Sequence, residues 1–253
     1  MVVYPDLKGK SVIVTGGARG IGKAFCRGFA ANGSKVVVAD RDFMNASNTV
    51  DEIRQSGGQA IAIQVDITNF EEVQNMAKRT LEVFGGVDIL VNNAALVGDL
   101  EVKPWDQIST EEWDRVLRVN VTGMFYCVRA VVPYMIKKGR GKIINISSDL
   151  FLKGGKGRLH YITSKAAVIG FTRALARELG DYNINVNAVA PGLTYTGHLR
   201  VPKEWFDEVS KQRCFKRIEY PEDLVGTILF LASEASDFIT GQTIVVNGGD
   251  VLY

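Results

Sequence analysis

The sequence has few of the residues on which several kinds of site depend. It contains two histidines and three cysteines in 253 residues, with neither a Cys-x-x-Cys nor a His-x-x-x-His spacing, so we expect no zinc site. Cys26, Cys127 and Cys214 are odd in number, far apart and each set in an apolar helical pattern. We therefore expect buried thiols in a reducing compartment and no disulfide framework.

An excess of one charge and a long apolar run are also absent. The 30 basic and 28 acidic residues leave a net charge of +2, which does not indicate a polyanion-binding protein, so we expect no nucleic-acid partner. Residues 1–10 lack the apolar core of a secretory signal, and no run reaches the roughly 18 apolar residues that cross a bilayer. We expect a cytoplasmic protein that does not bind membranes.

Short β-branched runs alternate with longer, helix-like apolar patterns along the whole chain. Most of the runs are almost continuously apolar, which is typical of parallel strands covered on both faces. The pattern predicts one doubly wound, Rossmann-type α/β domain over residues 1–253, with a seven-stranded parallel sheet between two helical layers. The predicted strands are Ser11–Gly16, Lys35–Asp40, Gln59–Asp66, Val87–Asn93, Gly141–Ser147, Asn183–Pro191 and Gln242–Gly249. The predicted helices are Ile21–Asn32, Phe43–Ser56, Phe70–Phe84, Glu111–Lys138, Tyr161–Gly180 and Pro221–Ser233.

Glycine is abundant: 26 of the 253 residues are glycine, whereas a usual share of about 7% would give about 18. Three of these glycines follow the first predicted strand. In the segment TGGARGIG, Gly16, Gly20 and Gly22 allow a tight turn and the close approach of a pyrophosphate to a helix N-terminus. A glycine-rich loop alone also fits an ordinary helix start. Its place after a strand, with an acid at the end of the next strand, favours a dinucleotide site.

That acid is Asp40, and it bears on which dinucleotide binds. A carboxylate there can accept hydrogen bonds from both adenosine ribose hydroxyls and repels the 2′-phosphate of NADP. Arg19 and Arg41 lie close in the sequence and could pair with such a phosphate, although exposed arginines are most often simply solvated. The sequence favours NAD over NADP.

Tyr161 and Lys165 are one helical turn apart in the segment YITSK, so both side chains lie on one helix face. A free tyrosine, with a pKa of about 10, exchanges protons poorly at neutral pH. A lysine charge roughly 6 Å away would lower the tyrosine pKa by about two units at an effective dielectric constant of about 20. The pair is a candidate proton-transfer site.

Six short motifs of the sequence resemble those of the short-chain dehydrogenase/reductase family in their order and spacing. They are TGGARGIG, NNAA at Asn92–Ala95, Asn120 in RVNVTG, ISS ending at Ser147–Ser148, the Tyr161–Lys165 motif, and PG at Pro191–Gly192. The resemblance extends from Leu7 to GQTIVVNGG near the end of the sequence.

The resemblance implies a role for each catalytic candidate. Tyr161 would be the general acid/base, and Lys165 would lower its pKa and hydrogen-bond the nicotinamide ribose. Ser148 would hydrogen-bond the substrate oxygen, in preference to Ser147. Asn120 would bend its helix and hold a water in a proton relay.

The resemblance also implies the cofactor contacts. Asp66 and Ile67 would contact adenine, Asn93 and Ala94 the adenosine ribose, and the backbone of Thr194 the nicotinamide carboxamide. The sequence departs from the family in having Ala95 for a glycine and Thr194 for an aliphatic residue. The cofactor-binding candidates are Gly16, Arg19, Gly20, Ile21, Gly22, Asp40, Asp66, Ile67, Asn93, Ala94, Tyr161, Lys165, Pro191, Gly192, Thr194 and Thr196.

Two segments, Asp149–His160 and Leu193–Phe215, are expected to shape the substrate pocket, the second as a loop or lid. Their apolar side chains suit a secondary alcohol or ketone with a hydrophobic or aromatic body, or alternatively only pack the loops. The basic residues Lys153, Lys156 and Arg158 would either recognise an acidic substrate or be solvated loop charges. The apolar candidates are Leu150, Phe151, Leu152, Tyr195, Leu199, Trp205 and Phe206.

Three functions remain open. The leading hypothesis is an NAD-dependent oxidoreductase that interconverts a hydrophobic, aryl or ring-bearing secondary alcohol and its ketone. The second is an NADP-dependent 3-oxoacyl thioester reductase, which the basic residues favour and Asp40 opposes. The third is a non-catalytic cofactor-binding scaffold, which would have no physical need for the Ser148–Tyr161–Lys165 arrangement. The resemblance implies a homotetramer.

Overall fold

Seven parallel strands form one sheet within the residues that the computed structural model describes, 3–197 and 202–252. The strand order is β3-β2-β1-β4-β5-β6-β7, so the chain reverses direction of winding between β1 and β4. The strands are Ser11–Thr15 (β1), Lys35–Asp40 (β2), Gln59–Gln64 (β3), Ile89–Asn92 (β4), Gly141–Ile146 (β5), Ile184–Pro191 (β6) and Thr243–Val246 (β7).

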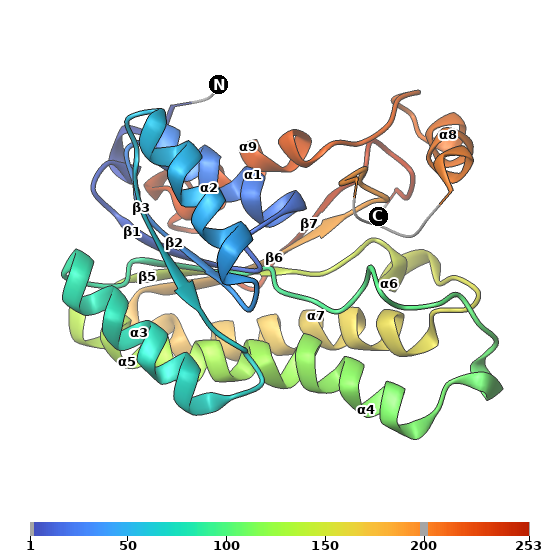
Figure 1. Cartoon of the computed structure of the whole chain (residues 1–253), viewed down its shortest axis with the longest axis horizontal. Coiled ribbons are helices and arrows are strands. Elements are labelled where there is room, and N and C mark those ends of the chain that lie inside the picture. The colour runs from blue at the N-terminus through green and yellow to red at the C-terminus, as the bar shows by residue number, and fades with distance from the viewer. Residues whose placement is uncertain (1–2, 198–201, 253) are drawn as a thin grey trace.

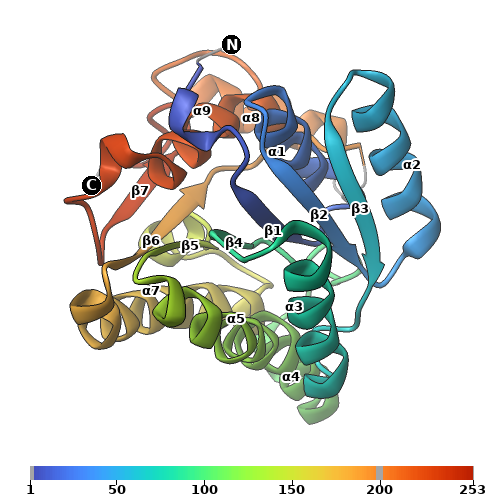
Figure 2. The same cartoon turned by 90° about the vertical axis from the view of Figure 1, so that its left-hand side faces the viewer.

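Helices cover both faces of this sheet (Figures 1 and 2). In Figure 2, α1, α2 and α9 lie above the sheet, and α3, α5 and α7 lie below it. The helices are Gly20–Ala31 (α1), Phe43–Gln55 (α2), Phe70–Phe84 (α3), Thr110–Leu117 (α4), Met124–Lys138 (α5), Leu150–Lys153 (α6), Leu159–Leu179 (α7), Lys203–Gln212 (α8) and Pro221–Ala232 (α9).

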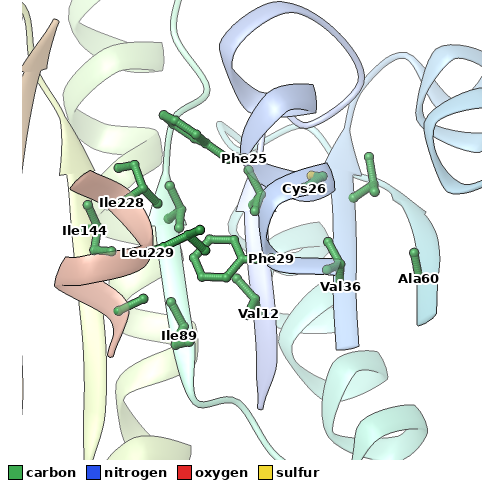
Figure 3. Packing of buried hydrophobic residues seen from close by; sticks show 14 of the residues in the cluster. Val12, Phe25, Cys26, Phe29, Val36, Ala60, Ile89, Ile144, Ile228 and Leu229 are labelled. Carbon is green, nitrogen blue, oxygen red and sulfur yellow. The ribbon is translucent and has the colours of Figure 1, made fainter. Parts of the chain in front are cut away.

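Alternating strand residues supply two separate cores, because successive side chains point to opposite faces of a sheet. Val12 belongs to the core under α1 and α9, whereas its neighbour Ile13 belongs to the core over α3 and α5. Figure 3 shows Phe29 of α1 among the side chains of the first core, with Leu229 of α9 and Val12 close by. The strands are nearly all apolar because both faces are covered.

The predicted fold class is confirmed by this topology, and the differences from prediction are local. Helices α6 and α8 were not predicted, and α8 lies inside the proposed lid, 193–215. The predicted helix Glu111–Lys138 contains a π-helical turn at Arg118–Gly123 between α4 and α5. Cys214 follows α8 and is exposed, which corrects the expectation of three buried helical cysteines. Leu199 lies outside the described residues.

One continuous helical stretch, Thr110–Lys138, is long and apolar enough by length and composition to cross a membrane. The core helices of soluble proteins pass the same test, so this is weak support for a membrane span. In this fold Cys127, Val131 and Met135 of the stretch are buried in the core over α3 and α5.

The carboxyl ends of the parallel strands meet at one edge of the sheet, where ligands bind in open α/β folds. Asp40 ends β2, Ser147 and Ser148 follow β5, and Pro191 ends β6. Three interstrand spacings separate β2 from β5, which is roughly 14 Å across the sheet. The topology thus places the two predicted ends of a dinucleotide site on one edge.

Candidate active site

A cavity of about 850 Å³ lies at this edge of the sheet. All sixteen predicted cofactor-binding residues line it, and so does Ser148. Asn120 is the one predicted site residue that does not line the cavity; it lies behind the wall. Residues spread over the whole sequence therefore come together in one continuous site.

The glycine-rich turn brings β1 and the start of α1 so close together that side chains do not fit. A Cβ on Gly22 would lie 2.1 Å from the carbonyl oxygen of Gly16. Gly16 itself has a φ of +65°, and a Cβ on it would lie 2.9 Å from the Cα of Ala94. The first backbone amides of α1 are thereby brought to the cavity wall, where a helix N-terminus favours a phosphate group. The turn fits a dinucleotide pyrophosphate.

Asn93 fixes this turn to the end of β4. Its side-chain amide donates hydrogen bonds to the carbonyl oxygens of Thr15 (2.9 Å) and Gly16 (3.1 Å). The hydroxyl of Thr15 accepts hydrogen bonds from the backbone amides of Asn93 and Ala94, both at 3.1 Å. Asn93 and Ala94 therefore hold the turn as well as lining the cavity.

The carboxylate of Asp40 is held at the cavity wall by two backbone amides. One oxygen accepts from the amide of Ala18 at 3.1 Å and the other from that of Asp42 at 3.0 Å. Each oxygen retains capacity for another hydrogen bond. Arg41 is exposed and lies 4.0 Å from Asp99 in a surface ion pair. The negative group on this wall is thus fixed, whereas Arg41, which also lines the cavity, is largely exposed.

Tyr161 and Lys165 lie on the buried face of α7, because their i, i+4 spacing matches the helical repeat. The ammonium of Lys165 lies 5.9 Å from the centre of the Tyr161 ring. The same ammonium donates a hydrogen bond of 2.8 Å to the carbonyl oxygen of Ile146, at the end of β5. Lys165 thereby fixes α7 against the sheet beside the tyrosine.

Burial dominates the ionisation of both groups. It raises the pKa of Tyr161 to about 12, against the opposing effects of a hydrogen bond with Ser148 and the positive charge of Arg158. It lowers the pKa of Lys165 to about 8. The expected fall in the tyrosine pKa is therefore not seen in the protein alone, because removing the phenolate from water outweighs the neighbouring charges.

The two serines after β5 have different partners. The hydroxyl of Ser147 donates a hydrogen bond of 2.7 Å to the carbonyl oxygen of Lys165, inside the protein. Both serines line the cavity, but the Ser148 hydroxyl hydrogen-bonds Tyr161. The geometry agrees with the choice of Ser148 over Ser147 as the group that meets a substrate.

Asn120 lies in the π-helical turn and joins three parts of the site from behind. Its side-chain oxygen accepts from the backbone amide of Leu96 at 2.7 Å. Its amide group donates to the carbonyl oxygen of Leu96 (3.3 Å) and to the hydroxyl of Ser164 (3.0 Å) on α7. The expected bend is a π-turn, which often marks functional positions in helices.

Only some of the predicted pocket residues line the cavity. Leu150 and Trp205 do, whereas the described side chains of Phe151, Leu152, Tyr195 and Phe206 do not. Tyr195 instead packs edge-on against Phe206, with ring centres 5.2 Å apart. Tyr195 and Phe206 therefore pack the loop, which was the alternative expectation for these side chains.

The three basic residues of the pocket loop also separate. Lys156 and Arg158 line the cavity. Lys153 also lines it, but its ammonium pairs with Asp149 at 3.1 Å and with Asp250 near the C-terminal end. Lys153 is thus neither a free loop charge nor an open anion site.

Several lining residues were not predicted. Leu96, Val97 and Val102 follow the NNAA motif and add apolar surface, and Arg115 of α4 and Arg118 of the π-helical turn add positive charge. The apolar residues after NNAA in the sequence indicated the first group. No sequence pattern indicated the two arginines, because only the tertiary fold turns this helical stretch toward the cavity.

Ala95, in place of the family glycine, causes no backbone strain. Asn183 is the one non-glycine residue with positive φ in the described parts of the chain, so Ala95 lies outside the left-handed region. The replacement is therefore compatible with an ordinary loop conformation.

Comparison with known proteins identifies the class to which this fold and site belong. Residues 10–205 match the family model described as short chain dehydrogenase, and the chain belongs to this family. It is an oxidoreductase enzyme with a Rossmann-type nicotinamide cofactor fold, and the scaffold alternative is not supported.

Similar proteins include reductases and dehydrogenases. A 3-oxoacyl-[acyl-carrier-protein] reductase of Synechocystis is 40% identical, with 98% of this chain and 99% of that protein covered. The (2S)-[(R)-hydroxy(phenyl)methyl]succinyl-CoA dehydrogenase subunit BbsD of Thauera aromatica is 38% identical, with 98% of each covered. The crystal structure of a short-chain type dehydrogenase/reductase from Mycobacterium marinum superimposes with a TM-score of 0.89, at 35% identity over 98% of this chain and 97% of that one.

Proposed function

We propose that the protein interconverts a secondary alcohol with an apolar body and its ketone, using NAD(H). The observation that carries this proposal is one cavity that joins Asp40 to Ser148, Tyr161 and Lys165. A fixed carboxylate at the ribose position supports NAD, because it can accept ribose hydroxyls and repels a 2′-phosphate. Leu96, Val97, Val102 and Trp205 supply apolar surface for the substrate body.

The chain's own residues account for the proton and the orientation. When bound, the nicotinamide supplies the hydride to the carbonyl carbon in reduction and accepts it in oxidation. Ser148 holds the substrate oxygen by a hydrogen bond. The Tyr161 hydroxyl gives its proton to that oxygen in reduction, and the tyrosinate takes it back in oxidation. The ammonium of Lys165 stabilises the tyrosinate electrostatically.

The second candidate is reduction of a 3-oxoacyl thioester with NADPH, and the relatives support it more directly than the first. Proteins of Synechocystis and Thermotoga maritima, 40% and 37% identical to this chain, carry the name 3-oxoacyl-[acyl-carrier-protein] reductase. Lys156, Arg158, Arg115 and Arg118 on the cavity wall also suit an anionic carrier group. Asp40 opposes the NADPH part of this candidate.

A substrate and cofactor panel tests the proposal and separates the two candidates. Acetoacetyl-CoA, an aryl ketone and a cyclic ketone would each be offered with NADH and with NADPH, and absorbance followed at 340 nm. The first candidate predicts the highest kcat/KM for an aryl or cyclic ketone with NADH. A preference for acetoacetyl-CoA with NADPH, together with a raised KM in Lys156→Ala and Arg158→Ala, would establish the second instead.

We also propose a cytoplasmic homotetramer. The exposed apolar side chains Phe125 and Ile136 on α5 and Leu159 on α7 support contact faces on these two long helices. Light scattering tests the assembly: a mass near four chains is expected, and a mass near the 27.7 kDa of one chain would contradict it. Fractionation of the source cells tests the location.

A further inference from the structure

A buried ion pair lies directly behind the loop that follows β6. Arg213 and Glu219 both come from the connection between α8 and α9, and their side chains are 2% and 5% exposed. The guanidinium lies 3.4 Å from the Glu219 carboxylate. In the part of the chain that the structure describes, neither residue lines the cavity. The pair therefore belongs to the layer behind the cavity wall.

Both members of the pair hold the loop residues Gly192–Tyr195. Arg213 donates a hydrogen bond of 2.9 Å to the carbonyl oxygen of Leu193. The Glu219 carboxylate accepts one of 2.7 Å from the hydroxyl of Thr194, and its backbone carbonyl accepts one of 2.8 Å from the amide of Tyr195. The pair therefore contacts three successive loop residues.

The fit between the pair and the loop is tight. A Cβ on Gly192 would lie 2.8 Å from the carboxylate of Glu219 and 2.9 Å from the guanidinium of Arg213, so any larger residue there would displace the pair. The other side of Gly192, Leu193 and Thr194 faces the cavity. A shift of the pair would consequently move the cavity wall.

Burying Arg213 and Glu219 has an unfavourable free energy, because Glu219 lies near other carboxylates and two polar atoms of the pair have no partner among the described residues. Burial raises the pKa of Glu219 to about 7, with Asp149 and Asp223 acting in the same direction and Thr194 and Arg213 opposing them. One carboxylate oxygen of Glu219 and the Nε of Arg213 lack a hydrogen-bond partner. Replacing a buried ion pair by well-packed apolar residues is often neutral or stabilising.

We propose that Arg213 and Glu219 are positioning residues that hold loop Gly192–Tyr195 in the conformation that receives the nicotinamide end of the cofactor. This inference rests on the proposed nicotinamide-dependent function. Through Thr194 and Leu193 the pair sets where the loop backbone meets the nicotinamide, while the adenosine end of the site, at Asp40, does not depend on it.

Binding measurements with two ligands test the proposal without relying on turnover. NADH carries the nicotinamide, whereas ADP-ribose has only the adenosine, pyrophosphate and ribose parts. The variant Glu219→Gln keeps the shape of the side chain and removes its charge, so binding is measured above pH 7, where the carboxylate of the unaltered protein is ionised. We expect its dissociation constant for NADH to rise about tenfold or more, since a hydrogen bond to a charged group is weakened, with that for ADP-ribose unchanged.

Matched variants complete the test. Glu208→Gln changes an exposed pair on α8 and should leave both constants unchanged. Thr194→Val should weaken NADH binding as Glu219→Gln does, Thr194→Ser should restore it, and the double variant should lose less than the sum of the two. If Glu219→Gln does not fold, the Thr194 variants carry the test alone.

Two results would overturn the positioning role: equal weakening of NADH and ADP-ribose binding, or no change in either. Failure of the unaltered protein to bind NADH or NADPH would instead overturn the proposed function.

Discussion

The ammonium of Lys165 lies 5.9 Å from the centre of the Tyr161 ring and donates a hydrogen bond to the carbonyl oxygen of Ile146. At this separation a positive charge stabilises a tyrosinate by about 3 kcal/mol at an effective dielectric constant of about 20. Burial lowers the pKa of Lys165 to about 8, so this charge is present at neutral pH and is lost above about pH 8. The lysine charge opposes the burial that keeps Tyr161 protonated.

The variant Lys165→Met removes that charge and leaves a side chain of similar length. Alcohol oxidation needs the tyrosinate, so kcat/KM for oxidation rises with pH through the apparent pKa of Tyr161. At pH 7, where Lys165 is charged, we expect kcat/KM for oxidation to be about a hundredfold lower in the variant, because a rise of about two units in the tyrosine pKa lowers the tyrosinate fraction by that factor. Above about pH 8 the lysine loses its charge, so the two proteins should differ less. Initial rates between pH 6 and 10 measure both effects. Equal rates at pH 7 would mean that Lys165 does not act on Tyr161.

Replacing Asp40 by asparagine tests cofactor preference. The amide keeps the shape of the carboxylate but removes the negative charge that would repel a 2′-phosphate. We expect the ratio of kcat/KM with NADH to that with NADPH to fall about tenfold or more, since like charges at a partly exposed site cost about 1–4 kcal/mol. Asp51→Asn, on the exposed face of α2, serves as the control. A ratio unaffected by Asp40→Asn would refute the assigned role.

Gly22→Ala tests the phosphate turn. Its methyl group would lie 2.1 Å from the carbonyl oxygen of Gly16, so the turn must open, and we expect loss of measurable NADH binding. Gly170→Ala, on the exposed face of α7, has open space around its Cβ and should bind NADH normally. The same replacement there should stabilise the protein by up to about 1 kcal/mol. Calorimetric titration measures binding, and retained affinity in Gly22→Ala would contradict the account.

Asn120→Ala tests the support behind the site. It removes three hydrogen bonds that join the π-helical turn to Leu96 and Ser164. We expect the free energy of unfolding in urea to fall by about 1–3 kcal/mol, and kcat to fall as well, because Leu96 lines the cavity. Asn48→Ala on the exposed face of α2 is the control and should change neither. Unchanged stability and kcat would show that Asn120 has no supporting role.

Much of this arrangement could be predicted because it depends on local chemistry. Most of the strands are nearly continuous apolar runs, and the turn at Gly16 and Gly22 needs glycine for steric reasons that act within a few residues. Tyr161 and Lys165 meet because of the helical repeat alone.

The remainder depends on contacts between distant segments. Arg213 and Glu219 look like two charges of a surface loop, and only the packing of that loop behind β6 buries them. Lys153 cannot be told from a free loop charge in the sequence, because its partner Asp250 is brought to it only by the fold. The exposure of Cys214 likewise follows from where α8 ends, which the apolar pattern does not define.

The most direct test of the central claim compares the unaltered protein with Tyr161→Phe at pH 7, in the reduction of the best ketone of the panel by NADH. Removing one hydroxyl eliminates the proton donor and leaves the cavity almost unchanged. We predict that kcat falls by a factor of about 10² to 10⁴, while the dissociation constant for NADH stays close to that of the unaltered protein. Turnover in Tyr161→Phe equal to that of the unaltered protein would contradict the account.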